Sequence, residues 1–476
     1  MRVGWHVARA GLVILLGSTM LNAGGCSLVV EKEIEGKGFG STCTSNGDCH
    51  AGVCEQNLCT AKCTGDADCP SPTKCVQKTG YCASPLHAGF MYVGVLEDQG
   101  WSYMQDQGRK AAQDALPYLT TDFALNVITD DDVNRTAREM IAKGANVILQ
   151  TSQGGTAPMG KLAQEFPGVT FLQLYNRTVS PPNLGSYWVK LQQSWYIAGY
   201  VAAKKSKTNR IAWIGGYVSP QGVVRANGFI RGARRANPNI KVDIRWVGFW
   251  FDPSINPPKY REILLTEQAL DAGADVVIGN IDNERPYDVV KQRREQNKDV
   301  WSIETNNPAS CEKYKDSCLG VAWLNWAPIY IDQLDQIHRK TWTPSYVHRG
   351  MAADKTQSPV GFTPSDQNLT DTNIRLEIAN MMSDFAKDPE APLRGPYNIS
   401  GAQREPVGDG EVISEDELLK MCWFPEGAIE KRNPDDPTSE DIPATVPVGD
   451  KTFLKKQYLS AANQGLADPP DCRKNL

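Results

Sequence analysis

The sequence has little of what catalytic, nucleic-acid-binding or membrane-spanning proteins need. Its 476 residues include five histidines, which form no cluster along the chain: His6, His50, His87, His338 and His348. It has no GxSxG, no HExxH and no GxGxxG placed after a strand, so we expect no catalytic residue, cofactor or metal site. The net charge of −5 argues against nucleic acid as the main partner. After residue 30, no apolar run approaches the length of a membrane span.

One stretch comes close to a phosphate-binding loop. Residues 155–161, GTAPMGK, fit GxxxxGK after a predicted strand. The next residue is Leu162, which cannot ligate magnesium as Ser or Thr would, and Pro158 removes a backbone N–H from the loop. We interpret the stretch as a loop that enters a helix, and an enzyme is the least favoured class.

The N-terminus has the pattern of a secretory signal. Arg2 and Arg9 precede the apolar run 10–16, which is followed by small residues as far as Cys26. The sequence Ala23-Gly24-Gly25-Cys26 resembles a bacterial lipobox, with Ala23 where a large apolar residue is usual. We therefore expect a signal peptide at 1–25, lipid on Cys26 and a tether at 26–42, which would hold the protein on the extracytoplasmic (periplasmic) side of a cell membrane.

Thirteen cysteines indicate an oxidising compartment, and eight of them fall within residues 43–82. There two halves repeat nearly the same cysteine spacing, and each half contains an Asp-Cys pair, Asp48-Cys49 and Asp68-Cys69. Four disulfides are predicted because forty residues cannot bury a sufficient core, but the sequence leaves their connectivity open. A zinc site would need CxxC pairs with longer gaps. Further on, Cys311 is expected to pair with Cys318 and Cys422 with Cys472, the alternative being a free buried thiol.

From residue 86 onwards, strand and helix patterns alternate. Strands are predicted at 88–96, 123–129, 146–150 and 169–174, with helices at 102–116, 132–143 and 158–166. After Gly185 the pattern restarts, with strands at 210–216, 241–250, 275–280 and 299–304 and helices at 193–205, 221–236, 258–272 and 284–297. The strands are apolar runs, which is typical of a parallel sheet covered on both faces. The fold class is therefore α/β, with two doubly wound parallel-sheet lobes after a disulfide-rich module.

Polar and aromatic residues follow several of these strands, where ligands bind in α/β sheets. Glu97-Asp98-Gln99-Gly100 forms a turn before the helix that begins near Trp101. Trp250 ends a strand of the second half. The candidate polar contacts to a ligand are Asp98, Ser152, Asp282, Glu304 and Asn306. The alternative interpretation is that the tryptophans belong to the core and the polar residues to solvent-exposed turns or helix caps.

Over residues 88–431 the chain resembles the basic membrane protein family of solute-binding lipoproteins, which includes bacterial purine nucleoside receptors. The matching stretches, in order, include Asp98-Gln99-Gly100-Trp101, Tyr196-Ile197-Ala198-Gly199, Gly232-Ala233-Arg234, Trp250-Phe251-Asp252-Pro253, Gly273-Ala274-Asp275-Val276-Val277 and Met421-Cys422-Trp423. The cysteine-rich module and the Pro- and acid-rich tail at 432–476 lie outside the resemblance.

The resemblance implies a type I periplasmic-binding-protein fold, with three chain crossings between its lobes. One lobe would comprise residues 86–190 and 305–345, and the other 191–304 and 346–431. It also implies the capture of a purine nucleobase or nucleoside, which is passed to the permease of an ABC importer. Trp101 and Trp250 match the two aromatic residues that stack on the ligand.

Two departures from the family pattern bear on the ligand. Leu324 stands where nucleoside-binding relatives have a lysine, and Glu304 where aspartate is usual. Together with Trp326 as a further ligand residue, they favour a nucleobase or another flat ring over a nucleoside. A runner-up interpretation is a surface interaction or sensory protein that uses the cysteine-rich module, with the lobes as its scaffold.

Overall fold

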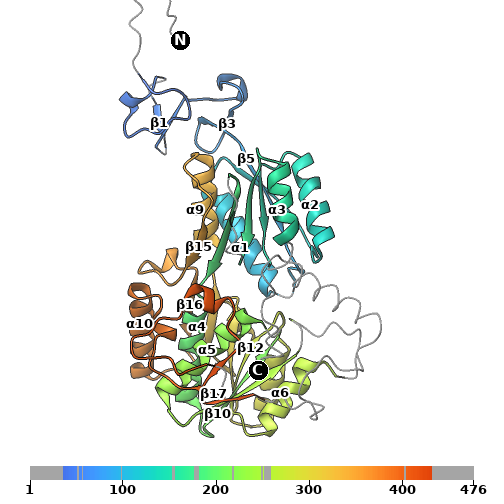
Figure 1. Ribbon diagram of the computed structural model, residues 1–476, viewed down its shortest axis with the longest axis vertical. Helices are drawn as coiled ribbons and strands as arrows, with labels where there is room; N and C mark the ends of the chain where they lie inside the picture. The colour runs from blue at the N-terminus through green and yellow to red at the C-terminus, as the bar shows by residue number, and fades with distance from the viewer. Residues whose placement is uncertain are drawn as a thin grey trace, which may run out of the picture. The chain divides into compact units, whose positions relative to one another are not determined.

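Apolar runs of strand length alternate with helices through most of the chain, and the computed structural model shows how they assemble (Figure 1). The structure describes residues 36–430, except for 51–52, 56, 98, 153–155, 176–178, 180–181, 217–218, 248–249, 251–258 and 401–403. The predicted signal peptide, Cys26 and the tail at 432–476 lie outside these residues. The chain divides into two compact units, one up to Cys59 and one from Thr60.

The cysteine-rich repeat is confirmed, and both halves have the same disulfide connectivity. The first half holds Cys43–Cys54 and Cys49–Cys59, and the second holds Cys63–Cys75 and Cys69–Cys82. Asp48 accepts hydrogen bonds from the backbone of Thr44 and Ser45, and Asp68 does the same for Thr64 and Gly65. Because each half closes its own two disulfides, the boundary between the compact units falls inside the predicted module, between residues 59 and 60.

The first lobe contains a six-stranded parallel sheet, in the order β15-β9-β8-β7-β5-β6. Its strands are β5 (Leu86–Met91), β6 (Leu119–Ala124), β7 (Val147–Gln150), β8 (Thr170–Leu174), β9 (Leu184–Val189) and β15 (Tyr346–Arg349). Its helices are α1 (Trp101–Ala115), α2 (Asp130–Ala142), α3 (Thr156–Glu165) and α9 (Ala327–His338). Phe90 packs with residues of α1 and α9, whereas Met91 packs with those of α2 and α3, so both faces of the sheet are covered.

The second lobe contains a seven-stranded sheet, in the order β16-β14-β13-β12-β10-β11-β19. Its strands are β10 (Arg210–Gly215), β11 (Lys241–Trp246), β12 (Val276–Asn280), β13 (Trp301–Asn306), β14 (Cys318–Leu324), the antiparallel β16 (Val360–Pro364) and β19 (Ala428–Glu430). Its helices are α4 (Leu191–Lys205), α5 (Pro220–Ala236), α6 (Arg261–Asp271), α7 (Arg285–Glu295), α8 (Ser310–Lys313), α10 (Thr372–Lys387) and α11 (Glu415–Leu418). Two doubly wound lobes are therefore confirmed.

The predicted division of the chain between the lobes is wrong in two places. Residues 305–345 were expected in the first lobe, but β14 pairs with β13 in the second sheet. Residues 346–431 were expected in the second lobe, but β15 pairs with β9 in the first. Both errors have the same cause: the resemblance implies the division only approximately, and the local sequence does not encode which sheet edge a strand joins. The predicted disulfide Cys311–Cys318 is confirmed, and it links α8 to β14. Cys422 is disulfide-bonded, while Cys472 lies outside the described residues.

The chain passes between the lobes three times: after β9, between β14 and α9, and between β15 and β16. The first and third crossings are joined by a hydrogen bond from Lys190 N to Arg349 O, 2.8 Å long. Among the described residues, no helix is both long enough and apolar enough for a membrane span.

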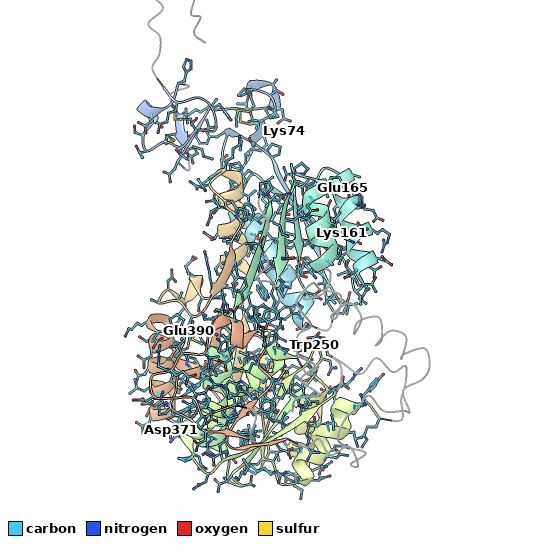
Figure 2. All side chains as sticks on the ribbon, viewed as in Figure 1. Lys74, Lys161, Glu165, Trp250, Asp371 and Glu390 are labelled. Atoms are coloured by element: carbon cyan, nitrogen blue, oxygen red, sulfur yellow. A yellow bond between two sulfur atoms is a disulfide. The ribbon has the colours of Figure 1, made fainter. Side chains whose placement is uncertain are left out.

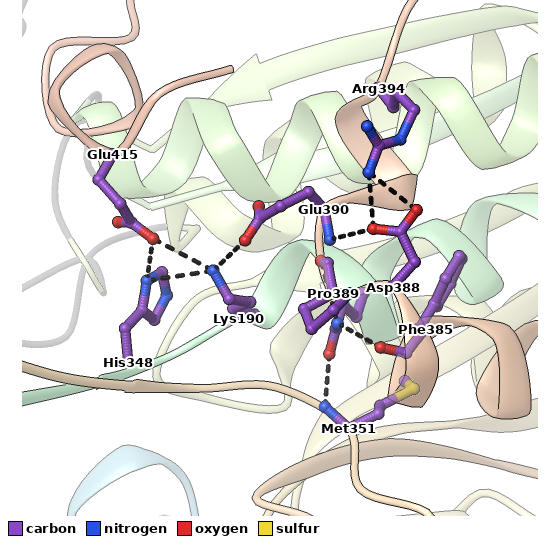
Figure 3. A network of polar contacts seen from close by, with 10 residues as sticks. Lys190, His348, Met351, Phe385, Asp388, Pro389, Glu390, Arg394 and Glu415 are labelled. Carbon is purple, nitrogen blue, oxygen red and sulfur yellow. Dashed lines mark hydrogen bonds and ion pairs between the residues drawn. The ribbon is translucent and has the colours of Figure 1, made fainter. Parts of the chain in front are cut away.

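A buried group of charges ties these crossings to the C-terminal segment; we call Lys190, His348, Glu390 and Glu415 the hinge cluster (Figure 3). Lys190 Nζ lies 2.7 Å from Glu390 Oε1 and 3.1 Å from Glu415 Oε1. His348 Nδ1 lies 2.5 Å from the same Glu415 oxygen. Burial alone would raise the pKa of Glu415, but the hydrogen bond from His348 and the charge of Lys190 lower it to about 2. Glu415 is therefore an anion that holds two crossings together.

Candidate functional site

The carboxyl ends of the first lobe's strands carry an ordered group of aromatic rings. Trp101 is the first residue of α1, and its Nε1 donates to Thr151 O, just beyond β7, at 2.8 Å. Trp188 lies near the end of β9, with its ring centroid 6.1 Å from that of Trp101. The hydrogen bond to Thr151 fixes the indole of Trp101 at the end of the sheet, where α/β proteins bind ligands.

An arginine of the second lobe lies close to these aromatic rings. The guanidinium carbon of Arg225, on α5, lies 5.8 Å from the ring centroid of Trp101, 5.9 Å from that of Trp188 and 5.7 Å from that of Trp250. Figure 2 labels Trp250 on the side of the second lobe that faces the first. Trp101 and Trp250, which were predicted to stack on the ligand, therefore lie at one site and come from different lobes.

Arg225 is an almost fully buried cation, with 7% of its surface exposed. Its Nη1 donates to Asn280 Oδ1 at the end of β12, at 2.6 Å, and its Nη2 to Gln221 Oε1 at 3.5 Å. Burial lowers the pKa of Arg225 to about 10, against the opposing charge of Asp282. The residue therefore stays charged at neutral pH, and it places one positive charge among three tryptophans.

The remaining predicted ligand residues differ in their burial and in their hydrogen-bond partners. The backbone N–H of Asp282 donates to Trp250 O at 2.9 Å, so the two residues are held side by side. Ser152 is half-buried and accepts a hydrogen bond from Gln150 Nε2 at 2.8 Å. Asn306 ends β13 with a positive φ of 66°, which asparagine tolerates better than most residues. Asp98 lies outside the described residues.

Two predicted ligand residues lie inside the protein instead of on its binding surface. Glu304 was expected to follow a strand, but it lies within β13 with 0% exposure, and Ser302 Oγ donates to its Oε1 at 2.8 Å. Trp326 also has 0% exposure, and its ring packs edge-on against Trp101 with centroids 5.3 Å apart. We therefore assign Trp326 a supporting position behind Trp101. The strand pattern placed Glu304 wrongly because the actual strand extends two residues further.

Several residues at the site were not identified from the sequence. Trp188 lies near the end of β9, which the apolar pattern did not reveal because Gly185 and Ser186 interrupt the run. Arg225 and Gln221 belong to a helix, where such residues ordinarily face solvent, so no sequence signal marked them. Asn307 Nδ2 donates to Gln99 Oε1 at 3.1 Å, which links the end of β13 to the turn before α1.

A small cavity of about 20 Å³ adjoins the site, lined among others by Tyr175, Trp188, Gln221, Arg225 and His348. This is room for about one water molecule. The cavity is therefore too small for an organic ligand, and it lies between the aromatic group and the hinge cluster.

Two doubly wound lobes joined by three crossings, with aromatic rings where they meet, have the architecture of bilobal solute-binding proteins. Residues 86–378 match the model of the family described as ABC transporter substrate-binding protein PnrA-like, and the chain belongs to this family. It is therefore the substrate-binding protein of an ABC transporter, and such proteins act outside the cytoplasm.

Known relatives cover most of the two lobes. The chain is 27% identical over 352 residues to the purine-binding protein of Brucella abortus (strain 2308), which covers 73% of this chain and 93% of that protein. It is 26% identical over 266 residues to a putative ABC transporter glucose-binding protein of Haloferax volcanii, which covers 56% of this chain and 64% of that protein.

Solved structures show the same fold. A solute-binding protein of an ABC transporter system from Conexibacter woesei aligns with a TM-score of 0.53 and 18% identity, over 65% of this chain and 98% of its own. A transcriptional activator from Bacillus halodurans aligns with a TM-score of 0.54 and 16% identity, over 64% of this chain and 98% of its own.

Proposed function

We propose that this chain captures a purine nucleobase or nucleoside between its lobes and passes it to the permease of an ABC importer, without covalent chemistry. The observation that carries the proposal is the convergence of Trp101 and Trp250, from different lobes, within 6 Å of one guanidinium carbon. Two such rings suit a flat ligand, and stacking on an aromatic side chain is worth about 1–3 kcal/mol per base. The Brucella abortus relative, whose name records purine binding, supports the same class.

The proposal includes a lipid anchor on Cys26, as the N-terminal sequence indicates. An anchored receptor stays near its permease, and ligand binding would stabilise the closed arrangement of the lobes by mass action. The polar residues that we assign to the ligand's edge are Asp282, Ser152, Asn306 and Asp98.

The test is thermal unfolding of the protein against hypoxanthine, adenine, inosine, adenosine and glucose. A ligand that binds the folded state raises the unfolding temperature in a concentration-dependent way. We expect a rise with at least one purine, and its loss in Trp101→Ala and Trp250→Ala. Trp301→Ala is the matched control, because Trp301 stacks with Lys205 and Arg294 at the opposite end of β13 and should keep the ligand-induced rise.

A rise with glucose alone would replace the purine by a sugar, which also stacks on tryptophan. No rise with any of these ligands, on folded protein, would reject small-molecule capture of these classes. The alternative function, a surface interaction or sensory protein, would then be favoured. The disulfide-bonded repeat favours that alternative in one respect, since it lies outside the family match at residues 86–378. If the protein binds a surface partner and Trp101→Ala keeps this binding, the alternative function is supported.

A further inference from the structure

Three buried side chains at the site present hydrogen-bond donors without acceptors. Arg225 Nε, Asn280 Nδ2 and Gln221 Nε2 have no hydrogen-bond partner among the described residues. The exposed fractions of these residues are 7%, 3% and 4%. A buried donor left without an acceptor costs about 1–3 kcal/mol, so three at one place call for an explanation. We call Gln221, Arg225 and Asn280 the donor cluster.

The orientation of the two amides follows from the chemistry of arginine. A guanidinium can only donate, so Asn280 and Gln221 must turn their carbonyl oxygens towards it. Their NH2 groups then point away from Arg225. The unpaired N–H groups of the donor cluster are therefore best matched by a ligand that supplies acceptors.

The cluster lies beside the rings proposed to hold the ligand. The guanidinium carbon of Arg225 lies within 6 Å of the ring centroids of Trp101, Trp188 and Trp250, so a flat ligand held by these tryptophans would lie within reach of the guanidinium. A purine with a 6-oxo group offers two adjacent acceptors, O6 and N7, and arginine is the residue that most often binds this pair. Adenine offers N7 next to a donating 6-amino group, which would face another donor.

Resting on the proposed function, we infer that the donor cluster makes this site selective for 6-oxopurines over 6-aminopurines, with Arg225 as the specificity-determining residue. A correctly matched bidentate contact discriminates between bases by roughly 5- to 150-fold. We therefore expect hypoxanthine to bind at least about fivefold more tightly than adenine, which has the same ring and differs at position 6.

The experiment is calorimetric titration of the whole protein and its variants with hypoxanthine and with adenine. Arg225→Gln replaces a pure donor by an amide, and an amide pairs well with the N6 and N7 positions of adenine. This variant is expected to lose the preference for hypoxanthine or to reverse it. Arg225→Lys keeps the charge but loses the planar fork, so we expect the affinity ratio to fall towards one while purine binding persists.

The outcomes separate this inference from the proposed function. Equal affinity of the wild-type protein for the two bases, or a ratio that Arg225→Gln and Arg225→Lys leave unchanged, overturns the role of the donor cluster while purine capture stands. If folded wild-type protein binds neither base and also binds neither inosine nor adenosine, the proposed function fails, and the inference fails with it. The thermal transition of each variant is measured alongside, and Arg225→Lys provides the decision if Arg225→Gln does not fold.

Discussion

At the scale of single residues, Glu304 shows how burial changes the chemistry of a carboxyl group. Its side chain has no exposed surface, one oxygen accepts from Ser302, and Oε2 has no partner among the described residues. Burial raises the pKa of Glu304 well above its usual range, and the nearby carboxylates of Glu284 and Asp288 act in the same direction. Both effects favour the protonated, neutral form of Glu304 in the folded protein.

This state predicts a pH-dependent effect of Glu304→Gln. Above the ordinary pKa of glutamate, the unfolded chain loses the proton that the folded chain keeps, so the wild-type free energy of unfolding falls as pH rises. Glutamine mimics the protonated acid and removes this dependence. At pH 8 we expect Glu304→Gln to be more stable than the wild type, and its advantage should grow by up to about 1.4 kcal/mol for each pH unit above the ordinary pKa of glutamate. The difference should vanish near pH 4, as measured by urea unfolding. A variant less stable than the wild type at pH 8 would contradict the assignment.

Single residues also show what the sequence can and cannot indicate about the site. Trp101 and Trp250 follow predicted strands, and the topology of α/β sheets then brings strand ends together, so these two could be predicted. Arg225 could not, because its burial arises from the packing of α5 against α4 and from Asn280, which is remote in sequence. Glu304 was misplaced because a strand end is uncertain by about two residues.

At the scale of elements, the helices α4 and α5 approach each other unusually closely. A Cβ added at Gly232 would overlap the carbonyl oxygen of Tyr196, and one added at Gly199 would overlap that of Phe229. These glycines belong to the stretches Tyr196-Ile197-Ala198-Gly199 and Gly232-Ala233-Arg234, which carried part of the family resemblance. The close approach fixes α5, and with it Arg225, relative to the start of α4.

Whether a Gly→Ala change in a helix raises or lowers the free energy of unfolding should therefore depend on the atoms that surround the glycine. Gly232→Ala is expected to lower the free energy of unfolding by about 2 kcal/mol or more, because backbone must move to admit the methyl group. Gly160 lies in α3 with no atom near the added Cβ. The control Gly160→Ala should raise stability by up to about 1 kcal/mol, since alanine loses less backbone entropy. Urea unfolding measures the change in the free energy of unfolding for both variants. Equal changes would contradict the claim that close packing of α4 and α5 excludes a methyl group at Gly232.

The elements differ in how well the sequence predicts them. Long apolar runs such as that of β12 and amphipathic helices such as α2 were recognised; α2, predicted from residue 132, begins at Asp130 and is capped by Thr129. Expected at 123–129, β6 instead spans Leu119–Ala124. Of the apolar residues that suggested the later strand, Phe123 is 45% and Leu125 36% exposed, whereas Val127 is buried outside the strand. The pairings of β14, β15 and β16 depend on contacts between remote segments, which local patterns do not contain.

At the scale of the whole molecule, the hinge cluster joins segments that are far apart in sequence. Lys190 belongs to the first crossing and His348 to β15, directly before the third, while Glu390 and Glu415 belong to the C-terminal segment (Figure 3). The side chain of Lys190 is 7% exposed and pairs with both carboxylates. Removing this cation should leave Glu390 without its charged partner and Glu415 with His348.

We therefore expect Lys190→Met to lower the free energy of unfolding by about 2 kcal/mol or more. The matched control is Lys207→Met, because Lys207 forms an exposed pair with Asp299, at 79% and 48% side-chain exposure. Exposed pairs contribute about 0–1 kcal/mol, so the control should change stability little. Denaturant unfolding of the two variants provides the comparison. If Lys190→Met costs no more than Lys207→Met, the cluster does not hold the crossings together.

The late position of two edge strands also affects when the chain can fold. The first sheet receives β15 from residues 346–349, and the second receives β19 from residues 428–430, next to a strand that begins at Lys241. Neither sheet is complete until synthesis has passed those points, and contacts of such long sequence separation form slowly. Each lobe can therefore close its sheet only after the other lobe's strands before that point have been made, which couples the completion of the two lobes during synthesis.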